Sequence, residues 1–300
     1  MMIDILLATY NGEKYLKEQL DSLKKQTLTD FKVLIHDDGS NDQTIKIINE
    51  FLEQDERFQL INDNIKFGNA GANFLHLLQF STSEFIMFCD QDDIWLENKI
   101  EKLFNVIKDK KGINAVYCNA YAYDGEKIIA QKVSLIERDN LSNSLFLNSG
   151  VQGCSLMFNR KLLELALDFP SYIYMHDHYI TMLAVAFGKL YYIDESLMLY
   201  RQHTSNVTGN VPITILDRFK TLVSRQSVII DRKHYLANKS LFEKFHEKLN
   251  LHDQRLFKDY LDFPTKKLFQ KFYSILKYNF KIGNSSTILF LKLFIKKTIN

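Results

Sequence analysis

The first two hundred residues alternate between short apolar runs and amphipathic segments. Four apolar runs have the length of buried strands: 3–8, 31–36, 58–61 and 85–88. The segments between them repeat apolar residues at helical spacing, as Leu16, Leu20 and Leu23 do. Strands that alternate with helices in this order predict an α/β fold, with a mostly parallel sheet covered by helices.

The pattern changes shortly after residue 200. Further apolar runs predict strands at 115–119, 155–158, 190–193 and 197–200, the last two separated by Asp194 and Glu195. Beyond Pro212 the chain becomes helical in pattern and rich in lysine and aromatic residues. We therefore expect an α/β domain over residues 1–210 and a basic, helical C-terminal extension over residues 211–300.

Polar residues gather where the predicted strands end. The first run is followed by Thr9, Tyr10 and Asn11, the second by Asp37 and Asp38, and the fourth by the segment 90–93. Ligands of such sheets bind outside the carboxyl ends of the strands. The three clusters are therefore expected to converge on one edge of the sheet.

The segment Asp90-Gln91-Asp92-Asp93 is the most informative of the three clusters. Carboxylates packed this closely repel and shift one another's pKa values. Hard divalent cations take oxygen ligands and commonly use one or two carboxylates plus substrate phosphates. The segment thus predicts a site for a metal ion and a diphosphate. The alternative is a solvated acidic turn that caps a helix starting near Leu96.

The other two clusters are suited to a nucleoside. Thr9, Tyr10 and Asn11 can stack on a base and bond to it, while Asp37 and Asp38 offer acceptors for a base N–H or a ribose hydroxyl. A turn is the alternative for the second cluster, because Asp-Gly-Ser is strong turn chemistry. The first strand is followed by neither a G-x-G-x-x-G segment nor a P-loop, which disfavours dinucleotide-dependent dehydrogenases and P-loop enzymes.

Composition and charge bound the remaining possibilities. The chain has 300 residues, of which 46% are apolar, enough for a large core. Its three cysteines are widely spaced and form no metal-type pairs, so a reduced, cytoplasmic setting is expected. The start of the chain does not read as a signal peptide, and no apolar stretch reaches the length of a membrane span.

Residues 263–300 differ sharply in charge from the rest. They hold eight lysines and no acidic residue, whereas the first 262 residues carry 30 basic and 36 acidic side chains, a net charge of −6. Lysines mixed with aromatic residues are typical of surfaces that lie on anionic lipid, and the apolar run 288–295 is too short to span a bilayer. Nucleic-acid binding and a helical bundle with a solvated lysine face are the alternatives.

A resemblance to a known family rests on several of these motifs together. They are Ala8-Thr9-Tyr10-Asn11-Gly12, Asp37-Asp38-Gly39-Ser40, Asp63-Asn64 through Gly68 to Asn73, and Asp90-Gln91-Asp92-Asp93-Ile94-Trp95. Their order resembles glycosyltransferase family 2 over roughly residues 2–209. The resemblance implies a Rossmann-like GT-A fold, a nucleotide-sugar donor, a divalent metal ion (Mn²⁺ or Mg²⁺) and an inverting mechanism.

A narrower resemblance concerns the second half of this region. The segments 153–160, His176-Asp177-His178 and 200–207 are similar to the bacterial rhamnosyltransferase branch, whose members use dTDP-L-rhamnose to build polysaccharide. Related sequences carry an aromatic pair after the His-Asp, whereas this chain has His178-Tyr179. That position is expected to line the acceptor site, so the departure bears on the identity of the acceptor.

The resemblance also implies a role for each matching residue. The donor-binding positions are Thr9, Tyr10, Asn11, Asp37, Asp38, Asn73, Asp90 and Arg201. Of these, Thr9 and Tyr10 contact the base, and Asp38 is favoured over Asp37 for recognising a pyrimidine. Asp90 faces the ribose. Asp92 is the main metal ligand, with Asp90 and His203 as further ligands. The acceptor-site positions are Gly153, Cys154, His176 and His178.

Asp177 is the expected general base, because an inverting transfer needs a carboxylate opposite the leaving diphosphate. Two of these assignments have structural alternatives. Asp177 can instead cap a helix that starts at His178, and His203 can be a histidine that serves packing alone.

The resulting hypothesis is a glycosyltransferase that moves a sugar to a hydroxyl of a growing, lipid-linked cell-surface polysaccharide. L-Rhamnose from its dTDP donor is the favoured sugar, and UDP-galactose, UDP-glucose or UDP-N-acetylglucosamine are the alternative donors. A non-catalytic scaffold that binds nucleotide or membrane is the non-enzyme alternative. We expect the protein in the cytoplasm, in peripheral contact with the inner face of the cytoplasmic membrane and not with nucleic acid.

Overall fold

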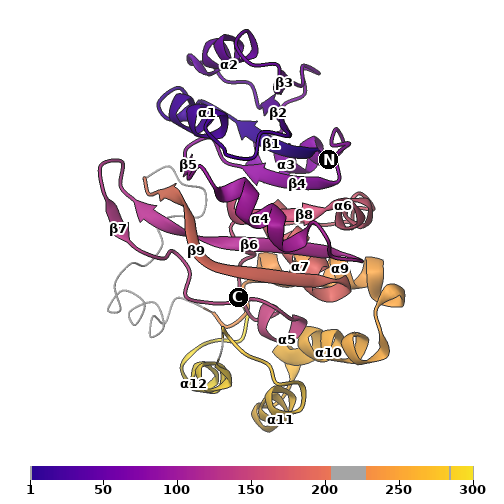
Figure 1. Cartoon of the computed structure of the whole chain (residues 1–300). Coiled ribbons are helices and arrows are strands. Elements are labelled where there is room, and N and C mark those ends of the chain that lie inside the picture. The colour runs from indigo at the N-terminus through magenta and orange to yellow at the C-terminus, as the bar shows by residue number, and fades with distance from the viewer. Residues whose placement is uncertain (1, 204–227, 284, 300) are drawn as a thin grey trace.

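The computed structural model describes residues 2–203, 228–283 and 285–299, and the chain is organised around one nine-stranded sheet. Its strands are β1 (Ile3–Thr9), β2 (Phe31–Asp37), β3 (Phe58–Leu60), β4 (Phe85–Cys89), β5 (Ile94–Trp95), β6 (Asn114–Tyr123), β7 (Ile128–Ala130), β8 (Leu156–Asn159) and β9 (Lys189–Arg201). They lie in the order β3-β2-β1-β4-β8-β6-β9-β5, and β7 pairs with β6 (Figure 1).

Most of the sheet is parallel, as the alternation of strand and helix patterns predicts. The strands β3, β2, β1 and β4 pair in parallel, and β6 pairs in parallel with β9. Between these two groups β8 runs antiparallel to both of its neighbours, so β6 keeps the direction of β4. The carboxyl ends of β1, β2, β4, β6 and β9 therefore point the same way.

The helices cover both faces of the sheet. They are α1 (Leu16–Lys24), α2 (Thr44–Leu52), α3 (Ala70–Leu78), α4 (Lys99–Ile107), α5 (Leu141–Ser144), α6 (Arg160–Ala166), α7 (His176–Phe187), α9 (Arg232–Phe245), α10 (Leu251–Asp262), α11 (Leu268–Tyr278) and α12 (Ser286–Ile295). In β1, Ile5 and Leu7 pack with α1, α2 and α4, whereas Leu6 packs with α3, α6 and α7. This alternation explains why a strand buried on both faces reads as a continuous apolar run.

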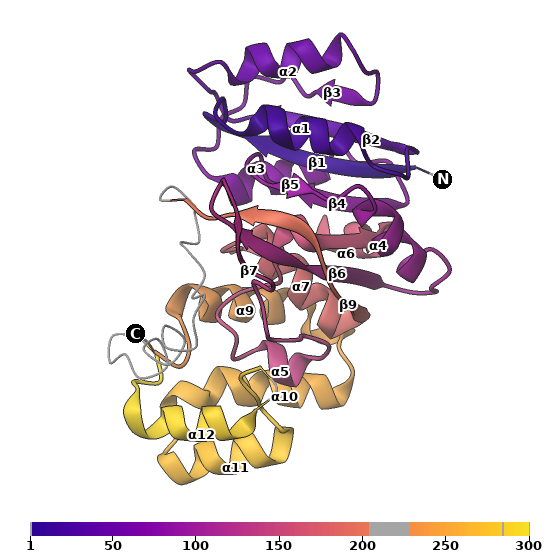
Figure 2. The ribbon, with the colours of Figure 1, turned by 60° about the vertical axis from the view of Figure 1, so that its left-hand side comes forward.

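The C-terminal helices join the same core. Phe146, next to α5, contacts the rings of Tyr260, Phe263 and Phe280 at centroid distances of 4.9–5.2 Å. Helices α10, α11 and α12 gather at the end of the molecule opposite α2 and β3 (Figures 1 and 2). The expected boundary between residues 210 and 211 lies outside the described residues. Within those residues, no helix combines the length and the apolar character needed to cross a bilayer.

One predicted break in the sheet is wrong. Instead of two short strands around Asp194 and Glu195, β9 runs without interruption and pairs with β6 along most of its length. The register shifts near Asn119, and the two acidic side chains turn outward, where they pair with Lys132 and Lys102. Polar residues inside a strand need not end it when their side chains reach solvent.

Candidate active site

A cavity of about 1050 Å³ opens at the edge where the parallel strands end. Its lining includes most of the residues that the sequence singles out: Thr9, Tyr10, Asn11, Asp38, Asn73, Asp90, Asp92, Gly153, Cys154, His176, Asp177, Arg201 and His203. Asp37 and His178 are not part of the lining. The strand ends therefore bring residues nearly 200 positions apart into one chamber.

The loops after β1 and β2 are held together by hydrogen bonds. Asp37 accepts bonds from the Thr9 hydroxyl at 2.8 Å and from the backbone N–H and hydroxyl of Ser40 at 2.7 and 2.6 Å. It therefore builds the turn, as the Asp-Gly-Ser alternative predicts. Asp38 instead faces the cavity, and its carboxylate accepts from the backbone N–H groups of Phe67 at 2.5 Å and Asn69 at 3.2 Å.

Tyr10 stands at the mouth of this part of the cavity. Its side chain is 55% exposed, so one face of the ring is open to a stacking partner. Its backbone is fixed by Gln91, whose amide accepts from Tyr10 N and donates to Tyr10 O, both at 2.9 Å. Gln91 thereby ties the first loop to the acidic segment.

The acidic segment does not cap a helix. It is followed by β5, and α4 begins only at Lys99 with Asn98 before it. Burial and then the Asp92 charge raise the pKa of Asp90 to about 7, and burial with the Asp92 and Asp90 charges raises the pKa of Asp93 well above its ordinary value. Asp93 Oδ1 accepts from Arg201 N at 3.1 Å, whereas Asp90 and Asp92 face the cavity.

A buried lysine lies beneath the acidic segment. The side chain of Lys99 is fully buried, its ammonium donates to Cys154 O at 2.6 Å, and it stands 3.4 Å from the centroid of the Trp95 ring. Burial lowers the pKa of Lys99, and its charge in turn lowers the pKa of Asp90. This cation offsets part of the repulsion among the carboxylates.

The end of β9 supplies two more residues to the acidic segment. His203 Nε2 lies 2.8 Å from Asp92 Oδ2, and its ring stacks on Tyr15 with a centroid distance of 5.2 Å. Arg201 is buried and donates to Asp92 O at 2.8 Å and to Glu18 Oε2 at 2.7 Å. These contacts of Arg201 support the loop around Asp92, and its contact with a donor stays a prediction.

Asp177 enters the cavity from the opposite wall, in the first turn of α7. Met175 occupies the N-cap position, and Asp177 Oδ1 accepts from the adjacent His178 N at 2.6 Å. Burial raises the pKa of Asp177 to about 6, although this hydrogen bond and the charge of Arg138 oppose the shift. The group is therefore a carboxylate at neutral pH with a proton affinity suited to a general base.

Two glycines allow the loop before η1 (Gly153–Ser155) to approach α7. A Cβ atom on Gly150 would lie 2.6 Å from the carbonyl carbon of Asp177, and one on Gly153 would lie 2.6 Å from His176 Nε2. This segment can pack so closely against the first turn of α7 because neither position carries a side chain. Gly153 thus has a steric reason for its identity.

The two histidines beside Asp177 are buried and neutral. Burial lowers the pKa of each to about 3. His176 packs on Phe74 and Phe88 at centroid distances of 4.1 and 4.7 Å, whereas His178 packs on His234 at 4.9 Å, away from the cavity lining. Cys154 is buried as well, and burial raises the pKa of its thiol well above the usual value, so it is no nucleophile.

The motifs do not reveal every residue of the cavity. Arg138 lies in its wall, donates to Ser149 Oγ at 2.8 Å, and has a buried Nε with no partner among the described residues. Arg138 belongs to an irregular stretch, and Lys99 reads as an ordinary charged position of a helix. Nothing in the sequence pattern marks either of them.

Comparisons with known proteins agree with this geometry. Residues 4–165 match the model of the family described as glycosyl transferase family 2. Among curated relatives, the dTDP-rhamnosyl transferase RfbG of Shigella flexneri is 30% identical over 68% of this chain and 73% of its own length. The UDP-Glc:alpha-D-GlcNAc-diphosphoundecaprenol beta-1,3-glucosyltransferase WfgD of Escherichia coli is 27% identical over 79% of this chain and 91% of its own.

Solved structures share the fold at low sequence identity. TarS of S. aureus, solved with UDP-GlcNAc, has a TM-score of 0.61 and 16% identity over 93% of this chain and 80% of its own. The mannosyltransferase PcManGT of Pyrobaculum calidifontis, solved with GDP-Man and Mn²⁺, has a TM-score of 0.53 and 16% identity over 97% of this chain and 78% of its own. The fold is GT-A, and the chain belongs to glycosyltransferase family 2.

Proposed function

We propose that this glycosyltransferase is metal-dependent and inverting, and that it moves L-rhamnose from dTDP-L-rhamnose to a hydroxyl of a growing, lipid-linked polysaccharide. One observation carries the mechanism: the sheet order β2-β1-β4 places Asp38, Tyr10 and then Asp90 and Asp92 in sequence along the lining of the cavity, and Asp177 enters that lining from α7. This is the order in which a nucleoside, a diphosphate and an attacking hydroxyl must be arranged.

The residues around Asp92 fit a divalent metal ion. Asp90 and Asp92 offer carboxylate oxygens, and His203 offers a ring nitrogen at 2.8 Å from Asp92. Burial and then the Asp92 charge raise the pKa of Asp90, and a cation would offset the contribution of that charge. When bound, Mn²⁺ or Mg²⁺ would neutralise the leaving diphosphate as a Lewis acid. Of these residues, Asp92 faces the cavity with His203 against it and is the ligand whose loss should matter most.

The transfer itself is a single displacement. The acceptor oxygen forms a bond to C1 of the sugar while the bond from C1 to the diphosphate oxygen breaks, which inverts C1. Asp177 takes the proton of the attacking hydroxyl, and the nucleoside diphosphate leaves with the electron pair. Arg138, whose charge lowers the pKa of Asp177, keeps that carboxylate ionised before the attack.

The choice of donor rests on relatives and is tested directly. The 30% identity to a protein named as a dTDP-rhamnosyl transferase supports dTDP-L-rhamnose, and the 27% identity to a protein named for UDP-Glc supports the alternative of a UDP-hexose. Melting the protein with Mn²⁺ and dTDP, UDP or GDP separates the two. Stabilisation by dTDP above that by UDP is expected, and the reverse order would contradict rhamnose as the sugar.

The mechanism is tested by donor turnover in three variants. Asp92→Asn and Asp177→Asn should each lower turnover by at least a hundredfold, because they remove the main metal ligand and the base. Asp109→Asn, at an exposed aspartate in the turn after α4, is the matched control and should keep full turnover. Turnover that survives in both cavity variants would refute the mechanism and favour the binding-scaffold alternative.

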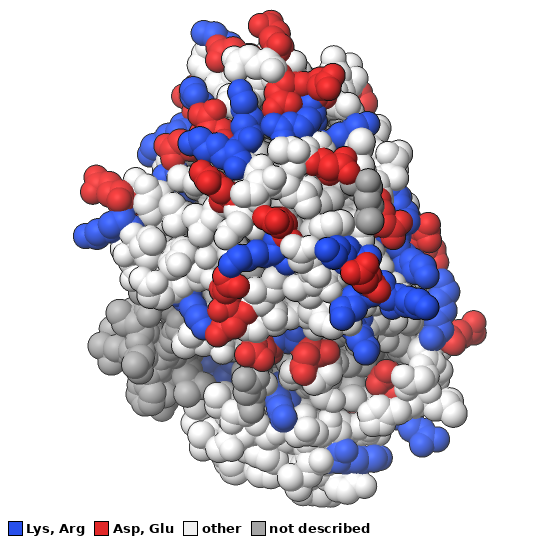
Figure 3. All heavy atoms as spheres, viewed as in Figure 1, with Lys and Arg blue, Asp and Glu red and all other residues white. Residues whose placement is uncertain are grey.

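We further propose that α11 and α12 contact the membrane that holds the acceptor. Both helices carry large exposed apolar side chains: Leu268, Phe269, Tyr273, Leu276, Leu291, Phe294 and Ile295. Lysines surround them, and this end of the molecule shows scattered basic groups on a mostly uncharged surface (Figure 3). Exposed aromatic and aliphatic groups among lysines suit an anionic bilayer, here the inner face of the cytoplasmic membrane.

Vesicle binding tests this surface. The full chain should co-sediment with vesicles of phosphatidylglycerol and phosphatidylcholine and much less with phosphatidylcholine alone. The double variant Phe269→Ser, Phe294→Ser should lose most of this binding, whereas Leu251→Ser should not, although Leu251 on α10 is as exposed as Phe269, at 69%. Equal binding by all three proteins would exclude this surface as the site of membrane contact.

A further inference from the structure

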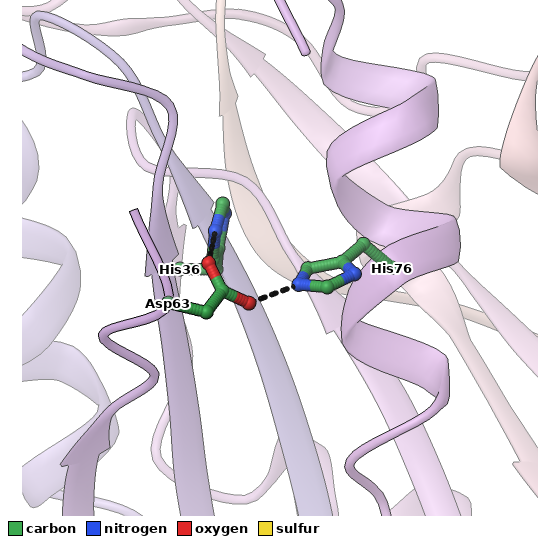
Figure 4. Close-up of side chains that lie close together, drawn as sticks. All are labelled: His36, Asp63 and His76. Atoms are coloured by element: carbon green, nitrogen blue, oxygen red, sulfur yellow. Dashed lines mark hydrogen bonds and ion pairs between the residues drawn. The ribbon is translucent and has the colours of Figure 1, made fainter. Parts of the chain in front are cut away.

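Two histidines converge on one carboxylate outside the cavity lining. Asp63, in the loop after β3, lies between His36 at the end of β2 and His76 on α3 (Figure 4). Its Oδ1 is 3.2 Å from His36 Nε2, and its Oδ2 is 2.5 Å from His76 Nε2. All three ligand atoms lie within 4.8 Å of one another. The three residues come from three separate elements, so the tertiary fold assembles this cluster.

The hydrogen bonds of His36 determine what its Nε2 can do. Asn73 Nδ2 donates to His36 O at 3.2 Å, which orients the amide so that Asn73 Oδ1 faces His36 Nδ1 at 2.7 Å. Nδ1 must therefore carry the hydrogen. In the neutral ring, Nε2 then points a lone pair at the Asp63 carboxylate. Two acceptors 3.2 Å apart repel unless a cation, either a proton or a metal ion, lies between them.

The surroundings suit a metal ion. Asp63 Oδ1 also accepts from Ile65 N at 3.1 Å, which holds the carboxylate in place between the two rings. The His76 ring packs between Phe67 and Phe80, each at a centroid distance of 5.0 Å. Asp63 is 25% exposed, which leaves a path from solvent.

We propose that His36, Asp63 and His76 bind a transition-metal ion such as Zn²⁺ in a second site outside the cavity, with water as the fourth ligand. Imidazole nitrogens bind zinc and similar transition metals in preference to Mg²⁺. The hydrogen bond from His36 Nδ1 to Asn73 Oδ1 is of the kind that orients a metal-ligating histidine ring. Metal–ligand bonds of about 2.0–2.1 Å set tetrahedral ligands roughly 3.4 Å apart. His36 Nε2 already lies at nearly this spacing from Asp63 Oδ1, at 3.2 Å. His76 Nε2 lies 2.5 Å from the other oxygen, Oδ2, so this ring and the carboxylate have to move apart by about 1 Å.

The site would fix the loop that holds Asp38. Asp63 begins a segment whose Phe67 and Asn69 N–H groups donate to the Asp38 carboxylate, and Phe67 itself packs on both histidine rings. A metal ion that ties Asp63 to β2 and α3 therefore stiffens one wall of the cavity without entering it. Zinc binding here does not depend on transfer activity, so its test and that of the proposed function fail independently.

The test titrates Zn²⁺ into metal-free Asp92→Asn protein, in which the main ligand of the cavity is removed. We expect one tightly bound zinc ion per chain and a higher melting temperature. Adding His76→Gln to this background should weaken zinc binding by at least tenfold, whereas adding His246→Gln, an exposed histidine on η2 (His246–Lys248), should not change it. Equal affinity in these two double variants, or no tight zinc in Asp92→Asn, would overturn the proposal.

A spectroscopic measurement leaves the cluster unaltered. Co²⁺ bound by two imidazoles and a carboxylate in tetrahedral geometry absorbs strongly in the visible range, whereas Co²⁺ with six oxygen ligands absorbs weakly. The Asp92→Asn protein should give the strong spectrum and lose it when Asp63→Asn is added. A weak spectrum from Asp92→Asn itself would refute the site even if the cluster variants failed to fold.

Discussion

The two walls of the cavity differ in how fully their polar groups are paired. The β1–β2 wall, residues 9–12 and 37–40, is closed by hydrogen bonds such as those from Ser40 to Asp37 and from Phe67 N to Asp38. The α7 wall, residues 149–154, 176 and 177 with Arg138, holds buried groups without partners among the described residues, including both ring nitrogens of His176 and Arg138 Nε.

This difference separates two kinds of recognition. A wall whose donors and acceptors are already paired keeps its shape before a ligand arrives, which suits a constant ligand such as a nucleoside. Buried polar groups without partners cost free energy, and a ligand that pairs with them recovers it. We infer that the β1–β2 wall is built for the donor and that the α7 wall stays incomplete until the acceptor binds.

The largest expected effect is that of Asp177→Asn, which should abolish transfer and yet stabilise the protein. Burial raises the pKa of Asp177 to about 6 in the folded state, against an ordinary pKa of 3.8. Ionisation of Asp177 therefore destabilises the folded state, and this destabilisation is absent below about pH 4 and complete above about pH 6. Asparagine avoids this cost. At pH 8 the free energy of unfolding of metal-free Asp177→Asn should exceed that of the metal-free parent by roughly 1–3 kcal/mol.

Denaturant melts at several pH values check this prediction. The advantage of Asp177→Asn should shrink as the pH falls from 8 to 4, because the parent carboxyl then becomes protonated in both states. A variant that is inactive and also less stable than the parent at pH 8 would contradict our description of the α7 wall as incomplete in the absence of ligand.

A substitution on the β1–β2 wall should lower the free energy of unfolding instead of raising it. Asp38→Ala leaves the N–H groups of Phe67 and Asn69 without their acceptor, and hydrogen bonds to charged groups contribute about 1.5–3 kcal/mol each. The two bonds together predict that the free energy of unfolding falls by roughly 3–6 kcal/mol, with a loss of nucleotide affinity. Asp38→Asn, which keeps one acceptor oxygen, should fall between Asp38→Ala and the parent. Equal stability of the three proteins would show that the β1–β2 wall is not held by these bonds.

The sequence pattern predicts the β1–β2 wall better than the α7 wall, for a physical reason. Strand periodicity fixes where β1, β2 and β4 end, and parallel pairing then brings Asp38 and Asp90 to one edge without further information. Lys99 lies beneath the acidic segment because Cys154 and Met198 pack against it, and Arg138 lines the cavity beside Ser149, so both positions depend on contacts with distant parts of the chain. The position of Asp177 is of this kind too, and it was predicted through family resemblance and not from periodicity.

The smallest expected effect is a change in pH dependence. If Asp177 is the base, turnover should rise with pH through a midpoint near 6 and level off above it, because only the carboxylate accepts a proton. The charge of Arg138 lowers the pKa of Asp177, so Arg138→Met should move this midpoint to higher pH, by up to about one unit. Arg138→Lys keeps the charge and should move the midpoint less. Turnover is measured from pH 5 to 9 at saturating donor and metal. An electrostatic role of Arg138 shifts the midpoint of this profile, whereas loss of a residue that only packs against the loop would lower the rate equally at every pH.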